Sequence, residues 1–272
     1  TKVKTRVIAR ALSELIYESS KIYIIGHKNP DMDCFGASIG LASIIKQMGK
    51  SCNIILNRDI NAIEYYLNKL ANQEKYNELF ISSEEAKNNM DDRTLVIILD
   101  VHNKSYILDL SLVEKANRKV IIDHHRRSPD MIEHDILNYI EVYASSTSEM
   151  ITEIIQYMVE KPKLTRLEAE GLLAGIYMDT KGFSFKTGVR TFEAAAYLKR
   201  NGADLTKVRK MSRESMETYR IRAKAISEAE ILYGRFAIAT LVGIGVDSPT
   251  VIGAQVANEL LDIDGIEASF VL

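Results

Sequence analysis

Short runs of consecutive apolar residues alternate with helical periodicity over the first 200 residues of this chain. The runs lie at residues 21–26 (KIYIIG), 51–56, 94–99 (TLVIIL) and 119–122 (KVII). A short, continuously apolar strand is typical of a sheet that is buried on both faces. Helical spacing separates the runs, for example at residues 1–17 and 33–48. The alternation predicts an α/β fold with a mostly parallel, doubly wound sheet.

Helical signals dominate the chain after residue 145, and strand signals return near its end. We predict helices at residues 146–159, 166–178 and 191–200, then a long, charge-dense helical connector at 204–229. A strand at 231–241, a helix at 251–260 and a strand at 266–272 follow. These signals predict a first domain at 1–203, a helical linker at 204–213 and a smaller α/β domain at 214–272.

Composition narrows the function classes. The chain has 272 residues, 46% of them hydrophobic and 26% charged, which indicates a folded globular protein. A net charge of −2 gives no overall basic field for duplex nucleic acid or a membrane surface, so an anionic substrate needs a local attraction such as bound metal. Cys34 and Cys52 are too few for a disulfide framework and indicate a reducing, cytoplasmic setting.

Neither end of the chain resembles a natural terminus. The sequence begins at Thr1 without methionine and stops at Leu272 inside an apolar stretch. No apolar run approaches the roughly 18 residues of a membrane span, so we expect no membrane contact by this segment. We expect the chain to be part of a longer protein, with its second domain incomplete.

Acidic residues and histidines follow three of the predicted strands. They are His27, Asp31, Asp33, Asp100, His102, Asp123, His124 and His125. Because the carboxyl ends of parallel strands meet at one edge, these side chains should lie together. Crowded carboxylates repel one another, and no cluster of lysines or arginines accompanies them to balance their charge. The pattern therefore indicates bound divalent metal.

The spacing of the first motif suits two metal ions. In the H-x-x-x-D-x-D segment, His27 and Asp31 can bind one ion and Asp33 a second, with Asp100 bridging them. Two ions about 3.5–4 Å apart stabilise the attacking and leaving oxygens of an in-line phosphoryl displacement. Mixed histidine and carboxylate ligands favour two Mn2+ ions, with Mg2+ or Co2+ possible.

These motifs resemble the DHH phosphoesterase superfamily, named for the triplet that is Asp123-His124-His125 here, and the resemblance extends to Asp179 in GIYMDTKGF. The resemblance implies two sets of metal ligands and two further roles. One metal would be held by His27, Asp31 and Asp100, and the other by Asp33, Asp100, His124 and Asp179. His125 would face the phosphate, and Asp123 would orient the histidines.

Longer segments are similar to bacterial cyclic-di-AMP phosphodiesterases of the GdpP type. They include TRVIARAL, FGASIG, DVHNKSY, SSTSEM and DTKGFSFKTGVRTFEAAAYL. This resemblance implies that residues 214–272 are a DHH-associated substrate-binding domain and that the protein is a homodimer. It also implies a cytoplasmic location, with membrane helices, a PAS-like domain and a degenerate cyclase-like domain ahead of Thr1 in the full-length protein. Such a second domain usually carries a Gly-Gly-Gly-x-His loop. With no histidine after His134, we expect the chain to end before it.

Several residues are candidates for substrate binding, each with a second interpretation. Ser146 and Thr147 open a helix, so they either cap it or bind a phosphate at its N-terminus. Phe183 belongs to the core or stacks on adenine, and Arg190 with Thr191 could contact phosphate. His102 either supports the metal site or contacts substrate.

Together these features predict a phosphodiesterase that hydrolyses cyclic di-AMP to linear pApA by a two-metal in-line mechanism. Asp100, Asp123 and His125 are its candidate catalytic residues. One alternative is an oligoribonuclease that cleaves short linear RNA such as pApA. Another is a sensor that binds a cyclic dinucleotide without cleaving it.

Overall fold

The computed structural model describes residues 2–56, 62–211, 215–241 and 249–272. It divides the chain into two compact units, Thr1–Ser212 and Arg213–Leu272. The domain boundary predicted at residues 213 and 214 lies outside the described residues, as does Thr1. Among the described helices, none is both long and apolar enough to cross a bilayer.

A six-stranded sheet forms the centre of the first unit, and each neighbouring pair of its strands is parallel. The strand order is β3-β2-β1-β4-β5-β6. The strands are β1 (Ile22–Ile25), β2 (Cys52–Ile55), β3 (Phe80–Ile81), β4 (Leu95–Leu99), β5 (Arg118–Asp123) and β6 (Leu137–Ile140). The order reverses between β1 and β4, and ligands of doubly wound sheets bind at such a reversal. The predicted α/β fold is confirmed.

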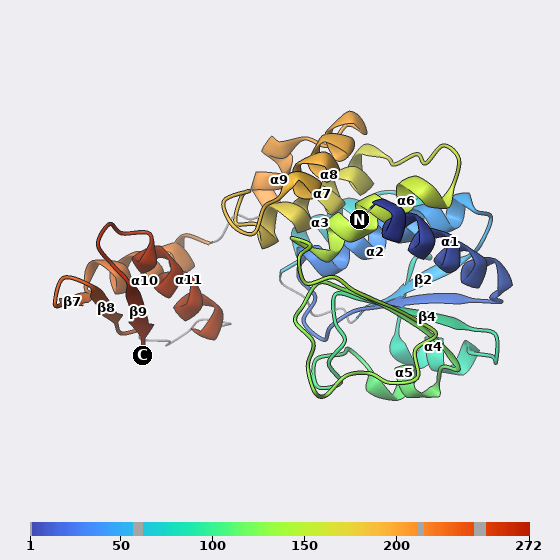
Figure 1. Ribbon diagram of the computed structural model, residues 1–272, viewed down its shortest axis with the longest axis horizontal. Coiled ribbons are helices and arrows are strands. Elements are labelled where there is room, and N and C mark those ends of the chain that lie inside the picture. Colours follow the sequence, from blue (N-terminus) through green and yellow to red (C-terminus); the bar gives the residue numbers. More distant parts are fainter. Residues whose placement is uncertain (1, 57–61, 212–214, 242–248) are drawn as a thin grey trace. The chain divides into compact units, whose positions relative to one another are not determined.

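Helices cover both faces of this sheet (Figure 1). One face packs against α1 (Lys2–Glu18), α2 (Met32–Gln47), α6 (Thr147–Met158) and α7 (Arg166–Asp179), and the other packs against α4 (Ser83–Asn89) and α5 (Leu110–Lys115). Alternate strand residues enter the two cores: Ile24 lies in the first and Ile25 in the second. Burial on both faces explains why the strands read as unbroken apolar runs.

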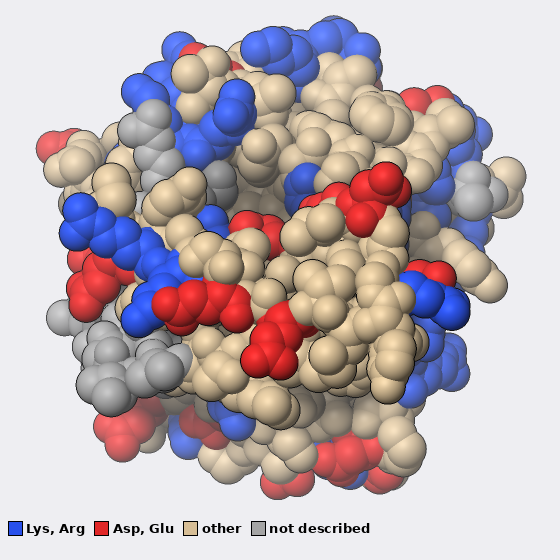
Figure 2. Space-filling view, turned by 90° about the vertical axis from the view of Figure 1, so that its left-hand side faces the viewer, with Lys and Arg blue, Asp and Glu red and all other residues tan. Residues whose placement is uncertain are grey.

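The remaining helices of the first unit also contribute buried residues to the first core. They are α3 (Glu64–Ala71), a 3-10 turn (Glu74–Tyr76), α8 (Val189–Arg200) and α9 (Leu205–Met211). The second unit contains α10 (Met216–Ser227), α11 (Pro249–Leu261) and a three-stranded sheet in the order β7 (Glu230–Leu232), β8 (Phe236–Ala239), β9 (Ala268–Val271). Lys and Arg are interspersed with Asp and Glu on the face drawn in Figure 2.

The segment 204–229, predicted as a long helical connector, is largely helical where the structure describes it, but it is not one element. The segment contains two helices, α9 and α10, whose apolar residues enter different cores. Val208 and Met211 of α9 are buried in the first unit, whereas Ala225 of α10 is buried in the second. Ser215 begins α10 by accepting a hydrogen bond from the N–H of Thr218. The many charged residues of this segment made it hard to recognise from sequence that its two helices have separate apolar faces.

Asp109 is the N-cap of α5, at the end of the loop that follows β4. Its charged contacts predict that the free energy of unfolding depends on pH. Its carboxylate accepts hydrogen bonds from Leu112 N and Ser111 Oγ and pairs with Lys87. Burial alone would raise the pKa of Asp109, but the contacts with Lys87 and Ser111 lower it to about 2. A carboxyl group with a lowered folded pKa stabilises the fold above its unfolded pKa of about 3.9. That stabilisation is lost as the pH falls to about 2.

Asp109→Asn keeps the cap and removes the charge. We expect it to lower Tm by about 2–4 °C at pH 7. The difference from wild type should shrink between pH 4 and pH 2 and vanish below pH 2. Thermal melts across this range measure it, with the exposed Asp92→Asn as the control. A difference of unchanged size at pH 2 would show that ionisation of Asp109 is not its cause.

Candidate metal centre and active site

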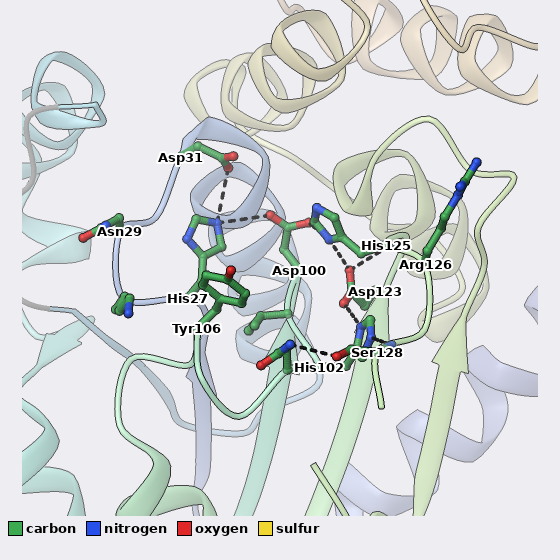
Figure 3. A pocket seen from close by; sticks show the side chains of 13 residues that line it. His27, Asn29, Asp31, Asp100, His102, Tyr106, Asp123, His125, Arg126 and Ser128 are labelled. Atoms are coloured by element: carbon green, nitrogen blue, oxygen red, sulfur yellow. Dashed lines mark hydrogen bonds and ion pairs between the residues drawn. The ribbon is translucent and has the colours of Figure 1, made fainter. Parts of the chain in front are cut away.

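Three neighbouring strands end at one edge of the sheet and bring acids and histidines together (Figure 3). His27 follows β1, Asp100 follows β4, and Asp123 is the last residue of β5, directly before His124. Asp100 has a φ of 64°, in the left-handed region that few non-glycine residues adopt. Its N–H still donates to Ile122 O, which keeps the residue attached to the end of the sheet.

The loop after β1 supplies two more carboxylates. Asp31 caps α2, and its Oδ1 lies 3.8 Å from His27 Nε2. Asp33 is buried in the first turn of α2 and points at the N-terminus of α6. There the N–H groups of Thr147 and Ser148 donate to its two carboxylate oxygens, at 2.6 and 2.8 Å. A helix N-terminus favours a negative charge, so α6 holds Asp33 in place.

Asp100 lies between two groups of possible metal ligands. Its Oδ2 is 3.4 Å from His27 Nε2, and its Oδ1 is 3.5 Å from His124 Nε2. The same His124 nitrogen lies 3.1 Å from Asp179 Oδ2 and 3.8 Å from Asp33 Oδ2. Asp179, the last residue of α7, therefore reaches the strand ends. One carboxyl group faces both sides of the centre.

The charges at this centre are not balanced within the protein. Burial and the neighbouring Asp179 raise the pKa of Asp33 to about 7. Burial and Asp33 raise the pKa of Asp100 well above its ordinary value. Burial would lower the pKa of His124, but the carboxylates of Asp179 and Asp33 raise it to about 9. These carboxyl groups repel one another, and a positive charge among them would relieve the repulsion.

The donor atoms fit divalent metal ions. His124 Nε2 is buried and has no aligned hydrogen-bond acceptor among the described residues, as expected of a nitrogen that binds something else. Three groups have donor atoms that all lie within 4.8 Å of one another: Asp33, His124 and Asp179; Asp100, His124 and His125; and His27, Cys34 and Asp100. Sequence reasoning left Cys34 out of the ligands. Burial raises the pKa of its thiol and so disfavours the thiolate that binds metal.

Asp123 connects two histidines behind this centre. Its Oδ1 contacts His125 Nδ1 at 2.7 Å, and its Oδ2 contacts His102 Nδ1. Because His102 Nε2 accepts the N–H of Ser128, the proton of a neutral His102 lies on Nδ1 and is donated to Asp123. Burial would raise the pKa of Asp123, but the hydrogen bonds from His102 and His125 lower it. His102 therefore supports Asp123, and both of its nitrogens are used within the protein.

The structure does not bring Ser146 and Thr147 to a surface where substrate could meet them. Both side chains are fully buried. Ser146 Oγ accepts the N–H of Glu149 and caps α6, while Thr147 Oγ1 donates to Asp100 Oδ1 at 2.9 Å. The helix N-terminus that sequence reasoning offered to a phosphate is occupied by Asp33. The long-range contact between Asp33 and α6 has no signal in the local sequence.

Arg190, Thr191 and Phe183 also have partners within the protein. Arg190 pairs with Glu153 through two nitrogens, and buried Thr191 donates to Glu149 at 2.6 Å. Phe183 is half-buried, and its ring stacks on a phenylalanine of α8 with 5.9 Å between centroids. These contacts join α8 to α6 and to the segment that follows α7. They favour packing roles for the three residues over contact with substrate.

A cavity of about 460 Å3 opens beside the metal centre. Its lining includes His27, Asp31, Asp100, Asp123 and His125, together with Lys28, Asn29, Asn103, Tyr106, Arg126 and Ser128. Sequence reasoning missed this second set as site residues. Their position in the sequence could have identified them, because each lies within six residues of a predicted ligand or catalytic residue.

Comparison with known proteins finds relatives over nearly the whole chain. Residues 21–176 match the DHH family, N-terminal domain. The chain is 42% identical over 275 residues to "Cyclic-di-AMP phosphodiesterase GdpP" of Bacillus subtilis, covering 99% of this chain and 41% of that protein. It is 36% identical over 284 residues to "Cyclic-di-AMP phosphodiesterase PdeA" of Listeria monocytogenes, covering 100% of this chain and 42% of that protein. The chain thus spans about two fifths of the length of these relatives.

A solved structure shares the fold. An exopolyphosphatase-related protein from Bacteroides fragilis superimposes with a TM-score of 0.74 at 19% sequence identity. The match covers 96% of this chain and 77% of that one. At this identity the likeness concerns the fold alone.

Proposed function

This chain belongs to the DHH family, and on that premise we propose that it hydrolyses cyclic di-AMP to linear pApA. The observation that carries the proposal is the position of Asp100, with one carboxylate oxygen near His27 and the other near His124. A carboxylate placed between two donor groups is what a two-metal phosphodiesterase requires. The two relatives named as cyclic-di-AMP phosphodiesterases, each aligned over nearly the whole chain, support the choice of substrate.

The metal ligands that we propose form two sets sharing Asp100. His27, Asp31 and Asp100 form one set, and Asp33, Asp100, His124 and Asp179 form the other. Divalent cations, for which we propose Mn2+, would supply a nucleophilic water at neutral pH and neutralise charge on the phosphoryl oxygens. The N-terminus of α6 holds Asp33 in the orientation that this role needs.

We propose that His125 supplies the proton that the leaving group takes up. Its Nδ1 is engaged by Asp123 at 2.7 Å, so Nε2 is the nitrogen available to a substrate in the cavity. As the bond between phosphorus and the 3′ oxygen breaks, Nε2 donates a proton to that oxygen. Asp123 stabilises the charged ring, and His102 holds Asp123 from its other side.

The test compares two substrates in the presence of Mn2+. We expect the chain to convert cyclic di-AMP to pApA, which chromatography detects. The chain should lose this activity in EDTA. His125→Asn should lower kcat about 100-fold, while His134→Asn, a surface histidine, should not change it.

Two other results would replace the proposal with one of its alternatives. Faster cleavage of pApA than of cyclic di-AMP would identify an oligoribonuclease. Binding of cyclic di-AMP in Mn2+ without cleavage would identify a sensor module.

A further inference from the structure

An aromatic ring stands exposed at the wall of the active-site cavity. Tyr106 lies in the loop between β4 and α5, six residues after Asp100, and the residue is 59% exposed. Figure 3 shows its ring beside His27, on the opposite side of the centre from Asp123 and Arg126. Its position at the cavity wall beside His27 makes the ring accessible to a ligand bound at this site.

The loop that carries Tyr106 is attached to the protein at several points. The N–H of Lys28 donates to Tyr106 O at 2.8 Å, and the N–H of Leu108 donates to Gly26 O at 3.0 Å. These two bonds join the loop to the segment that follows β1 and contains His27. The ring is therefore presented by a backbone that is already ordered, and a ligand would not have to order it.

Asn103 fastens the start of the same loop. Its side-chain oxygen accepts the N–H of Ser105 at 2.8 Å, and its side-chain nitrogen donates to Ser128 Oγ at 2.9 Å. Ser105 Oγ donates to Asp130 at 3.0 Å. The loop is thus held both to the segment after β1 and to the segment after β5. The side chains of Asn103 and Ser105 are therefore engaged in hydrogen bonds within the protein, and the exposed Tyr106 ring lines the cavity.

The surroundings of Tyr106 suit a nucleotide. Lys28 Nζ lies 5.6 Å from the centre of the ring and donates to Ser105 O, so a positive charge accompanies the aromatic surface. Both residues line the cavity that contains His27 and Asp100. A nucleotide bound at the metal centre carries a flat base and a negatively charged phosphate on the same sugar. An aromatic face beside a cation is the pairing that single nucleotides use on proteins.

The phenylalanines after Asp179 do not offer the same surface. Phe183 is half-buried and stacks within the helical layer. Phe185 is exposed and, like Tyr106, has lysines near its ring, with Lys181 and Lys186 at 5.1 and 5.5 Å from the ring centre. Neither phenylalanine lines the cavity beside the metal centre. Tyr106 is the aromatic residue among the cavity's lining residues.

We propose that Tyr106 is the stacking surface for the nucleobase adjoining the scissile phosphate, and that Lys28 lies beside that nucleotide. This proposal rests on the proposed function, because it uses the same site. Tyr106 is a binding residue here: its ring fixes the position of the nucleotide while the chemistry takes place at the metal centre. Stacking needs the ring and not the hydroxyl, since every base has a π face.

The test separates ring from hydroxyl and binding from turnover. Tyr106→Ala should raise KM for cyclic di-AMP about 10- to 100-fold and leave kcat within about threefold of wild type. Tyr106→Phe should behave like wild type. Tyr143→Ala, which removes a 93% exposed tyrosine outside the cavity, is the matched control and should change nothing. A cyclic dinucleotide analogue with abasic sugars should be turned over equally by wild type and Tyr106→Ala.

Fluorescence gives a readout independent of turnover. A dinucleotide containing 2-aminopurine should be quenched on binding to wild type and to Tyr106→Phe, and much less when bound to Tyr106→Ala. Equal affinity and quenching in wild type and Tyr106→Ala would overturn the proposal, and so would a phenylalanine variant as weak as the alanine variant.

The same titration distinguishes this proposal from the proposed function. A wild type that binds and quenches the dinucleotide without cleaving it overturns the enzyme activity while the stacking result stands. A wild type that binds no dinucleotide overturns both.

Discussion

Asp100→Asn is expected to lower kcat for cyclic di-AMP at least about 1000-fold while the protein stays folded. A shared metal ligand contributes several kcal/mol to the stabilisation of the transition state, and each 1.4 kcal/mol is a factor of ten. Asparagine is chosen for two structural reasons. It tolerates the left-handed backbone at φ 64° better than alanine, and it can still accept the hydrogen bond from Thr147 Oγ1.

The stability of the variant separates lost chemistry from a lost fold. Burial and Asp33 already favour the neutral form of Asp100 when metal is absent. A neutral asparagine should therefore leave Tm of the metal-free protein unchanged or higher, because it relieves repulsion between buried carboxylates. Wild type should gain Tm when Mn2+ is added, and the variant should gain less. Calorimetry should detect weaker metal binding, and Asp92→Asn is the surface control.

Activity and metal binding in Asp100→Asn that match wild type would contradict the bridging role. A large fall in Tm of the metal-free variant would instead show that the carboxyl group is needed for folding.

Gly36→Ala is expected to give the largest loss of stability, about 3 kcal/mol. A methyl group on Gly36 would lie 2.2 Å from the carbonyl oxygen of Gly171, at the point where α2 meets α7. Backbone cannot move aside as a flexible side chain can, so the two helices would have to separate. Tm should fall by about 6–12 °C.

The same substitution should weaken metal binding. Asp33 lies on α2 and Asp179 on α7, so a wider separation of the helices moves two proposed ligands apart. Gly175 sits beside them, where a methyl group would lie 2.2 Å from Ser148 Oγ and 2.8 Å from Asp33. The close approach of α2 and α7 therefore serves both packing and the proposed metal centre.

Gly253→Ala is the matched control for helix propensity. A methyl group on Gly253 in α11 would meet its nearest atoms at 3.7 Å, an ordinary contact. It should stabilise its helix by about 0.5–1 kcal/mol, because alanine is the better helix former. If Gly36→Ala melted at the wild-type temperature, the close contact between α2 and α7 would be disproved.

Local sequence was sufficient for the four inner strands and for the residues at their carboxyl ends, but not for the edge strands β3 and β6, which are short or only partly buried. Each central strand is a continuous apolar run, and burial on both faces imposes that pattern independently of distant partners. His27, Asp100 and Asp123 follow such runs directly. Once parallel strands were expected, their carboxyl ends had to converge. Asp179 was different: it ends a helix, and only family resemblance drew attention to it.

Local sequence was insufficient wherever a polar side chain had to choose a partner. Ser146 and Thr147 are residue types that cap helices or bind phosphate, Arg190 can pair with a carboxylate or a phosphate, and nothing in their sequence neighbourhood decides between these roles. The structure decides it through contacts across long stretches of chain, such as Thr147 with Asp33 and Arg190 with Glu153. The same holds for residues 204–229, where charge along the chain concealed helices that belong to two units.

The sequence by itself determined the parallel sheet and the acids and histidines at its edge, because burial and strand direction act on consecutive residues. Only the tertiary structure decided which side chains make hydrogen bonds within the protein and which remain accessible to a ligand. It gave the N-terminus of α6 to Asp33 and left Tyr106 exposed in the cavity. Burial and hydrogen-bond pairing depend on residues far apart in the chain, so no local pattern encodes them.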